Sequence, residues 1–172
     1  MSSHELRIDG FKILVVDDAP DNRLLVSRFL NLAGATVETA TDGPEGIGAA
    51  LAANYDAILM DIQMPGMDGY EAVERLRAHR YVGPIVALTA HAMKSEKSRC
   101  LASGFDDYLT KPISRIHLLQ TLIRVVHAKR AESQALSAIQ RADIQPDPEM
   151  PRGPQEERQI PDRKPDSPEA RH

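Results

Sequence analysis

Five short apolar runs alternate with helical patterns over the first 127 residues of this 172-residue chain. The runs have the length of strands and occupy residues 11–16, 35–39, 57–60, 84–88 and 105–109. The apolar spacing between and after them predicts helices that begin near residues 20, 43, 68, 94 and 114. Parallel strands need right-handed crossovers, which these helices can supply. The sequence therefore predicts an α/β fold with a doubly wound parallel sheet.

The helical patterns also predict which side chains face the sheet. Those expected to face inward are Leu24, Leu25, Phe29 and Leu32 in the first helix, Ile47 and Leu51 in the second, Val73 and Leu76 in the third, Cys100 and Leu101 in the fourth, and Ile116, Leu119, Leu122, Ile123 and Val126 in the fifth. Asp68, followed by Glu71 three residues later, resembles a capping box and predicts the start of the third helix.

Polar side chains follow four of the five apolar runs. They are Asp17 and Asp18 after the first run, Asp61 after the third, Thr89 after the fourth and Lys111 after the fifth. Ligands of open α/β sheets bind beyond the carboxyl ends of the strands, so we expect these side chains to converge. A buried carboxylate without a partner is costly, and Asp61 therefore indicates a site.

The chemistry open to this cluster is limited, because three carboxylates repel one another unless a cation lies between them. Oxygen ligands favour Mg²⁺, which leaves coordination positions for phosphate oxygens. Asp61 could then attack a phosphoryl group, while Lys111 and the Thr89 hydroxyl stabilise the transferring oxygens. Asp17 or Asp18 could instead cap the helix that begins at residue 20, but capping does not explain both aspartates together with Asp61 and Lys111.

Four segments, taken together and in this order, resemble the receiver domain of two-component response regulators over residues 11–127. They read ILVVDD at 13–18, LMDIQMPGMDG at 59–69, ALTA at 87–90 and DDYLTKP at 106–112. The residues in these segments are most similar to those of receivers associated with hybrid kinases. The resemblance implies a flavodoxin-like fold with five helices and strand order 2-1-3-4-5.

The resemblance also implies how the site works in a phosphorelay. Asp61 would accept a phosphoryl group from a phosphohistidine on a sensor histidine kinase or a histidine phosphotransfer protein. Asp18, Asp61 and the backbone carbonyl of Gln63 would bind Mg²⁺ directly, and Asp17 largely through water. Such a domain is not an enzyme in the usual sense, because it catalyses only its own phosphorylation and dephosphorylation.

The same resemblance implies which residues change conformation when Asp61 is phosphorylated. The Thr89 hydroxyl would move toward the phosphoryl group, and the Tyr108 ring would turn inward. A downstream protein would read this change on the surface of the fourth helix, the fifth strand and the fifth helix. The Lys111–Pro112 peptide bond would be cis. Gln63 and His91 would influence the lifetime of the phosphorylated state, or else be solvated loop side chains.

Composition narrows the remaining classes of function. The net charge of −4 gives no reason to expect nucleic-acid binding, and one cysteine, Cys100, cannot form an internal disulfide. Cys100 is expected to be a small core residue. The first residues resemble no signal peptide and no apolar run approaches membrane-spanning length, so we expect a cytoplasmic protein that does not contact a membrane.

The sequence divides into four parts. Residues 1–10 form an N-terminal lead, 11–127 the receiver-like domain, 128–144 a possible extension of the last helix, and 145–172 a tail. Seven of the chain's 12 prolines lie in that tail, which predicts disorder, and no separate output domain is expected there.

Other functions remain as alternatives. The chain could be a pseudo-receiver that only binds partners, or a fragment of a hybrid histidine kinase. An aspartate-nucleophile hydrolase is disfavoured, because such enzymes carry an Asp-x-Asp pattern after the first strand. A dinucleotide-binding enzyme is disfavoured as well, since the first turn lacks the glycine fingerprint.

Overall fold

The computed structural model describes residues 6–142 and contains one five-stranded sheet in the order β2-β1-β3-β4-β5. The strands are β1 (Lys12–Val16), β2 (Thr36–Ala40), β3 (Ala57–Asp61), β4 (Ile85–Thr89) and β5 (Asp107–Thr110). Every neighbouring pair is parallel. The predicted doubly wound sheet and its strand order are confirmed. The predicted tail at 145–172 and the first five residues lie outside the described residues.

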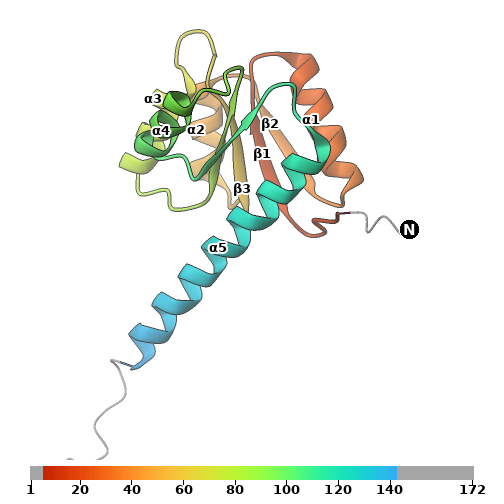
Figure 1. Cartoon of the computed structure of the whole chain (residues 1–172). Helices are drawn as coiled ribbons and strands as arrows, with labels where there is room; N and C mark the ends of the chain where they lie inside the picture. Colours follow the sequence, from red (N-terminus) through yellow and green to blue (C-terminus); the bar gives the residue numbers. More distant parts are fainter. Residues whose placement is uncertain (1–5, 143–172) are drawn as a thin grey trace, which may run out of the picture.

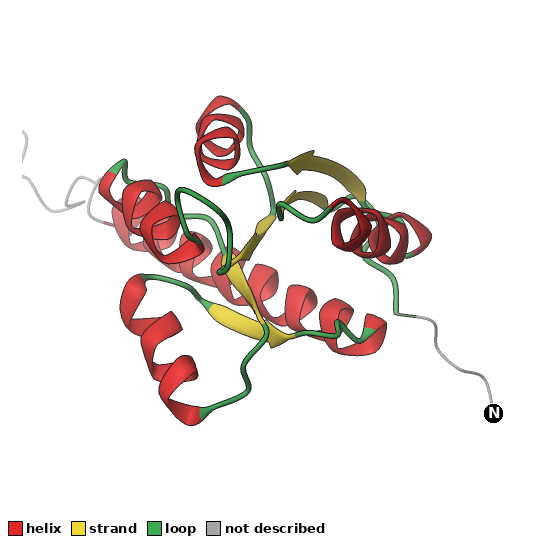
Figure 2. Cartoon of the chain, turned by 90° about the horizontal axis from the view of Figure 1, so that it is seen from above, coloured by secondary structure: helices red, strands yellow, loops and turns green. Residues whose placement is uncertain are grey.

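Helices cover both faces of the sheet (Figure 2). They are α1 (Pro20–Leu32), α2 (Gly43–Ala52), α3 (Gly69–Ala78), α4 (Lys94–Ser103) and α5 (Arg115–Ala142). One core cluster joins α1 and α5 to the sheet, and the other joins α2, α3 and α4 to its opposite face. Within the described part of the chain, no helix is both long enough and apolar enough to cross a bilayer.

The central strands are buried on both faces, which explains their continuous apolar runs. In β1, Ile13 and Val15 belong to the cluster under α1 and α5, whereas Leu14 and Val16 belong to the cluster under α2, α3 and α4. Side chains alternate between the two faces of a strand, so one run supplies both cores. Ile8, which precedes β1, is also buried, and its backbone N–H donates to the carbonyl of Ala33 at 2.9 Å.

Short polar residues set the starts of two helices. The Asp42 carboxylate accepts from the Glu45 backbone N–H at 2.8 Å at the start of α2. Asp68 accepts from the Glu71 backbone N–H at 2.8 Å at the start of α3, as the sequence predicts. Such caps satisfy N–H groups that lack partners in the first turn of a helix. Because α2 follows β2 and α3 follows β3, both helices begin at the carboxyl edge of the sheet.

The prediction of inward-facing side chains is confirmed for Val73, Leu76, Leu119, Leu122 and Val126, which are buried, but it was wrong at several other positions. Leu24, Leu25 and Leu32 of α1 are 71%, 44% and 57% exposed, and the helix buries Val26 and Leu30 instead. Leu51, Leu101 and Ile116, which were also expected to face inward, are exposed. Helical spacing fixes the angles between side chains but not the rotation of the helix about its axis, which contacts with the sheet decide.

Candidate functional site

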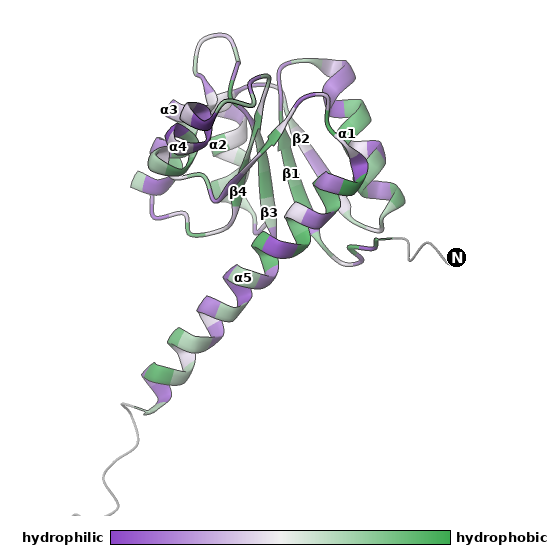
Figure 3. Cartoon of the chain, in the orientation of Figure 1, coloured by the Kyte–Doolittle hydropathy of each residue, from purple (hydrophilic) through white to green (hydrophobic). Residues whose placement is uncertain are grey.

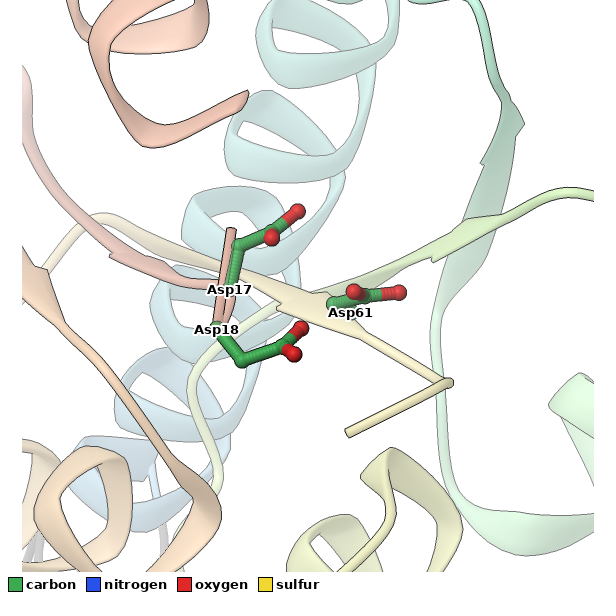
Figure 4. Close-up of side chains that lie close together, drawn as sticks. All are labelled: Asp17, Asp18 and Asp61. Atoms are coloured by element: carbon green, nitrogen blue, oxygen red, sulfur yellow. The ribbon is translucent and has the colours of Figure 1, made fainter. Parts of the chain in front are cut away.

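The predicted carboxylates meet at the carboxyl edge of the sheet. Asp61 is the last residue of β3, and Asp17 and Asp18 directly follow β1. One carboxylate oxygen from each of the three residues lies within 4.8 Å of the others. Figure 4 shows the side chains of these residues beside one another at the ends of two neighbouring strands. Adjacent parallel strands therefore bring together residues more than 40 positions apart in the sequence.

Lys111 supplies the cation that this cluster needs. Its Nζ lies 3.0 Å from Oδ2 of Asp17 and 3.0 Å from Oδ2 of Asp61, so the ammonium bridges two buried carboxylates. The residue follows β5, and its backbone N–H donates to the Thr89 carbonyl at 2.7 Å. The peptide bond between Lys111 and Pro112 is cis.

The electrostatics of the site follow from burial and these contacts. Burial raises the pKa of the Asp61 carboxyl and the charge of Asp17 adds to the rise, whereas Lys111 opposes it. For Lys111, burial alone would lower the pKa, but the hydrogen bonds and charges of Asp17 and Asp61 outweigh it and raise the pKa. Lys111 is therefore a stable cation at neutral pH. Asp18 is exposed at the rim of the cluster.

The loop after β1 is held by two residues that the sequence analysis missed. Arg23 Nη1 donates to the Asp17 carbonyl at 2.6 Å and to the Asp18 carbonyl at 3.0 Å. Asn22 Nδ2 lies 3.3 Å from Asp17 Oδ2. Asp17 Oδ1 also accepts from the Ala19 backbone N–H at 2.9 Å, but α1 has no side-chain cap at its N-cap residue Ala19. The helix-capping alternative for Asp17 and Asp18 is therefore not needed to explain their position.

The loop after β3 packs tightly beneath Asp61. The backbone N–H of Gln63 donates to Asp61 Oδ1 at 3.2 Å, and the Gln63 side chain is exposed. Gly69 donates its N–H to the Ile62 carbonyl at 2.9 Å. A Cβ at Gly69 would lie 2.8 Å from the Cα of Ile62 and would overlap the carbonyl oxygen of Asp61. Only glycine lets α3 begin this close to the strand that carries Asp61.

Thr89 and Tyr108 lie on neighbouring strands. Thr89 is the last residue of β4 and is buried, and its hydroxyl accepts from the His91 backbone N–H at 3.1 Å. Tyr108 is partly exposed, and its ring centroid lies 6.0 Å from Lys97 Nζ of α4. Tyr108 lines a cavity of about 410 Å³, together with Lys97, Thr110, Pro112, His117 and Arg124. The cavity lies along β5 between α4 and α5.

Comparisons with known proteins agree with this arrangement. The sequence model of the family described as the response regulator receiver domain matches residues 13–123. The chain is 48% identical over 118 residues to the sensor protein GacS of Pseudomonas syringae pv. syringae, which covers 66% of this chain and 13% of GacS. The chain thus spans a small part of the length of that relative.

Two solved structures are similar as well. One is the receiver domain of the sensor histidine kinase PA1611 from Pseudomonas aeruginosa, which is 40% identical to this chain and superposes with a TM-score of 0.63. The match covers 69% of this chain and 98% of the PA1611 domain. That structure holds a magnesium ion in its active site cleft. The yeast receiver domain of Ssk1, in complex with the histidine phosphotransfer protein Ypd1, has a TM-score of 0.64 and 28% identity, covering 67% of this chain and 88% of that chain. From its motifs, fold and acidic cluster together with these matches, the chain belongs to the response regulator receiver domain family of two-component signalling.

Proposed function

We propose that this receiver accepts a phosphoryl group on Asp61 from a phosphohistidine and uses it to change a protein-docking surface. The observation that carries the proposal is the Lys111 ammonium, which lies 3.0 Å from the carboxylates of both Asp17 and Asp61 beside the exposed Asp18. A buried carboxylate held next to a fixed cation and an acidic rim suits the transfer of a charged group. The domain catalyses only the phosphorylation and dephosphorylation of its own aspartate.

The donor set fits a magnesium ion. Carboxylate oxygens from Asp17, Asp18 and Asp61 lie within 4.8 Å of one another, and Mg²⁺ prefers such oxygen ligands. We assign Asp18, Asp61 and the backbone carbonyl of Gln63 as direct ligands. Asp17 already accepts hydrogen bonds from Lys111 and from the Ala19 backbone, so we assign it a contact through water. When bound, the ion would neutralise negative charge on the aspartates and on the incoming phosphoryl oxygens.

The residues of the chain then have distinct roles in the transfer. An oxygen of Asp61 attacks phosphorus, the new P–O bond replaces the P–N bond of the phosphohistidine, and the imidazole leaves and takes a proton from solvent. Lys111 holds a phosphoryl oxygen in place of the carboxylate oxygen it contacts at 3.0 Å. The Thr89 hydroxyl gives up its contact with the His91 backbone N–H and donates to another phosphoryl oxygen.

The donor needs a surface beside Asp61. The exposed Leu24 of α1 and the exposed Ile116 at the start of α5 both lie on elements that begin just after the site residues, on the same face of the sheet. We propose that these side chains contact an apolar helix surface of the phosphohistidine protein. The Ssk1 receiver in complex with Ypd1 is a relative whose solved structure includes such a partner.

The output surface lies on α4, β5 and α5. When Thr89 moves toward the phosphoryl group, it vacates space that the Tyr108 ring can fill, which alters the cavity of about 410 Å³ between α4 and α5. A downstream protein that docks there would sense whether Asp61 is phosphorylated. The energy comes from the new charge-assisted hydrogen bonds of Lys111 and Thr89.

Intact-mass measurement after incubation with acetyl phosphate tests the proposal. The wild-type chain should gain one phosphoryl group with Mg²⁺ and none with EDTA, and Asp61→Asn should gain none. The matched control is Asp68→Asn, which changes a nearby aspartate that only caps α3 and should be phosphorylated normally. A gain by Asp61→Asn equal to that of the wild type would contradict the assignment of Asp61. If a folded wild-type chain accepts no phosphoryl group from acetyl phosphate or from a phosphorylated histidine protein, the chain is a pseudo-receiver.

A further inference from the structure

Arg23 lies on the side of α1 that packs against the sheet. Val26 and Leu30, which follow it on that side of the helix, are buried. The helix packs against β1 and β2 (Figure 1), and Figure 3 shows β1 as a hydrophobic strand and α1 as a helix with bands of hydrophilic residues. Helical side chains lean toward the N-terminus of their helix, so Arg23 in the first turn of α1 reaches back over the loop that joins β1 to α1.

The Arg23 guanidinium holds the two peptide groups on either side of the Asp18 Cα. Its Nη1 donates to the carbonyl of Asp17 at 2.6 Å and to the carbonyl of Asp18 at 3.0 Å. Because each peptide group is planar, the two backbone dihedral angles of a residue set how the groups meet at its Cα. Holding both carbonyl oxygens therefore fixes the backbone of Asp18 and the direction in which its side chain leaves the loop.

The two aspartates of this loop are held in different ways. Asp17 is buried, and its carboxylate accepts hydrogen bonds from Lys111 Nζ at 3.0 Å and from the Ala19 backbone N–H at 2.9 Å. Asp18 is exposed, and Arg23 holds it through its backbone carbonyl. The position of the Asp17 carboxylate thus depends on its own hydrogen bonds, whereas that of the Asp18 carboxylate depends on Arg23.

A carboxylate at the start of α2 balances part of the Arg23 charge. The backbone N–H and the hydroxyl of Thr41 both donate to Glu45 Oε2 at 2.7 Å. These hydrogen bonds lower the pKa of Glu45, and the positive charge of Arg23 lowers it further. The Glu45 charge offsets the repulsion between the guanidinium and a cation bound at the acidic cluster, so an arginine is tolerated beside that cluster.

We infer that Arg23 is a positioning residue that sets the affinity of the acidic cluster for Mg²⁺ and its preference for Mg²⁺ over Ca²⁺. The inference rests on the proposed function, in which Asp18 is a direct ligand of the ion. Mg²⁺ requires near-octahedral oxygen ligands at about 2.0–2.1 Å, whereas Ca²⁺ accepts a flexible set at about 2.3–2.6 Å. A displaced Asp18 carboxylate therefore weakens Mg²⁺ binding more than Ca²⁺ binding.

Titration of the full chain with MgCl₂ or CaCl₂, followed by NMR at constant ionic strength without a phosphoryl donor, tests the inference. Arg23→Ala should bind Mg²⁺ at least about tenfold more weakly, because losing a group that orients a metal ligand typically costs about 10–100-fold in affinity. Its affinity for Ca²⁺ should fall by about threefold or less, because Ca²⁺ tolerates a displaced ligand. The matched control is Arg28→Ala, which removes the same charge from an exposed position of α1 and should keep both affinities within about twofold.

The charge of Arg23 acts in the opposite direction to its hydrogen bonds. Removing a positive charge should by itself strengthen the binding of both ions. Tighter or unchanged binding of both ions by Arg23→Ala, or equal losses for the two ions, would therefore overturn the inference. Arg23→Lys keeps the charge on a side chain that is one atom shorter, and its ratio of Mg²⁺ to Ca²⁺ affinity should also fall. If Arg23→Ala does not fold, a wild-type ratio in Arg23→Lys would overturn the inference.

Phosphorylation by acetyl phosphate provides a second test. For Arg23→Ala, the Mg²⁺ concentration that gives half the maximal rate should rise by the same factor as the Mg²⁺ dissociation constant. The rate at saturating Mg²⁺ should stay within about twofold of the wild type, since the groups that contact the phosphoryl group are unchanged. A lower saturating rate at an unchanged Mg²⁺ requirement would overturn the inference. A wild-type chain that binds neither ion would refute the magnesium site itself, whereas equal Mg²⁺ binding by the wild type and Arg23→Ala would refute this inference alone.

Discussion

Asp61→Asn should make the folded protein more stable although it removes the proposed phosphoacceptor. The wild-type carboxylate is 3% exposed and lies near the carboxylates of Asp17 and Asp18. Burial and the charge of Asp17 raise its pKa, which means that the folded state disfavours its ionised form. Asparagine has nearly the same shape and no charge. The substitution therefore removes a cost while leaving Lys111 its ion pair with Asp17 at 3.0 Å.

The size of this stabilisation can be worked out from the charged groups that surround the Asp61 carboxylate. At 3.0 Å the attraction between Lys111 and Asp61 is about 5 kcal/mol for an effective dielectric constant of about 20. The oxygens of Asp17 and Asp61 lie within 4.8 Å of each other, so the repulsion between them is about 3–4 kcal/mol or more on the same scale. The exposed Asp18 adds about 1 kcal/mol after screening by solvent. Attraction and repulsion thus nearly cancel, and the uncompensated desolvation of Asp61 leaves a net gain of about 1–3 kcal/mol for Asp61→Asn.

Urea unfolding without Mg²⁺ measures this difference. We expect the free energy of unfolding of Asp61→Asn to exceed the wild-type value by about 1–3 kcal/mol at pH 7, with an unchanged slope. The gain should shrink as the pH falls from the raised folded pKa of Asp61 toward its unfolded pKa, because the wild-type carboxyl then becomes neutral as well. Mg²⁺ should also reduce the gain, since it binds the folded wild type more tightly than the variant.

Two further variants test whether the charges around Asp61 determine its effect on stability. Asp68→Asn should leave stability almost unchanged, because asparagine caps a helix about as well as aspartate. Lys111→Ala should act in the opposite direction and cost about 3–5 kcal/mol, since it leaves Asp17 and Asp61 buried without a cation. If Asp61→Asn is no more stable than the wild type at pH 7 without Mg²⁺, the electrostatic account of the site is wrong.

Two other predictions concern the packing around the site. Gly69→Ala should lower the free energy of unfolding by about 1–3 kcal/mol, because its Cβ would lie 2.8 Å from the Cα of Ile62. The control in the same urea experiment is Gly48→Ala, because a Cβ at Gly48 meets nothing within 4 Å. Cys100 should resist alkylation at pH 8 in the folded protein, because burial raises the pKa of its thiol and less thiolate is present. Mass spectrometry should show rapid modification only in urea, and rapid modification of the native protein would contradict its place in the core.

Local patterns in the sequence were enough to predict much of the fold. The apolar run of β3 is continuous because both faces of the strand are covered, and it ends at Asp61 because the next residues leave the sheet. The capping role of Asp68 depends on residues three positions apart. The expected place of Cys100 in the core is confirmed by its complete burial. Such features depend on neighbours in the sequence, so they can be read without the tertiary structure.

The sequence by itself thus determined the strands, their order through the family motifs, and the carboxyl edge at which Asp17, Asp18 and Asp61 meet. Only the tertiary structure decided which side of each helix is buried, so that Val26 faces the sheet while Leu24 faces solvent. It also decided that Arg23 of α1 donates a hydrogen bond to the backbone of the loop after β1. The physical reason is that a repeat of 3.6 residues sets the relative angles of side chains, whereas the rotation of a helix against a sheet depends on contacts between distant segments.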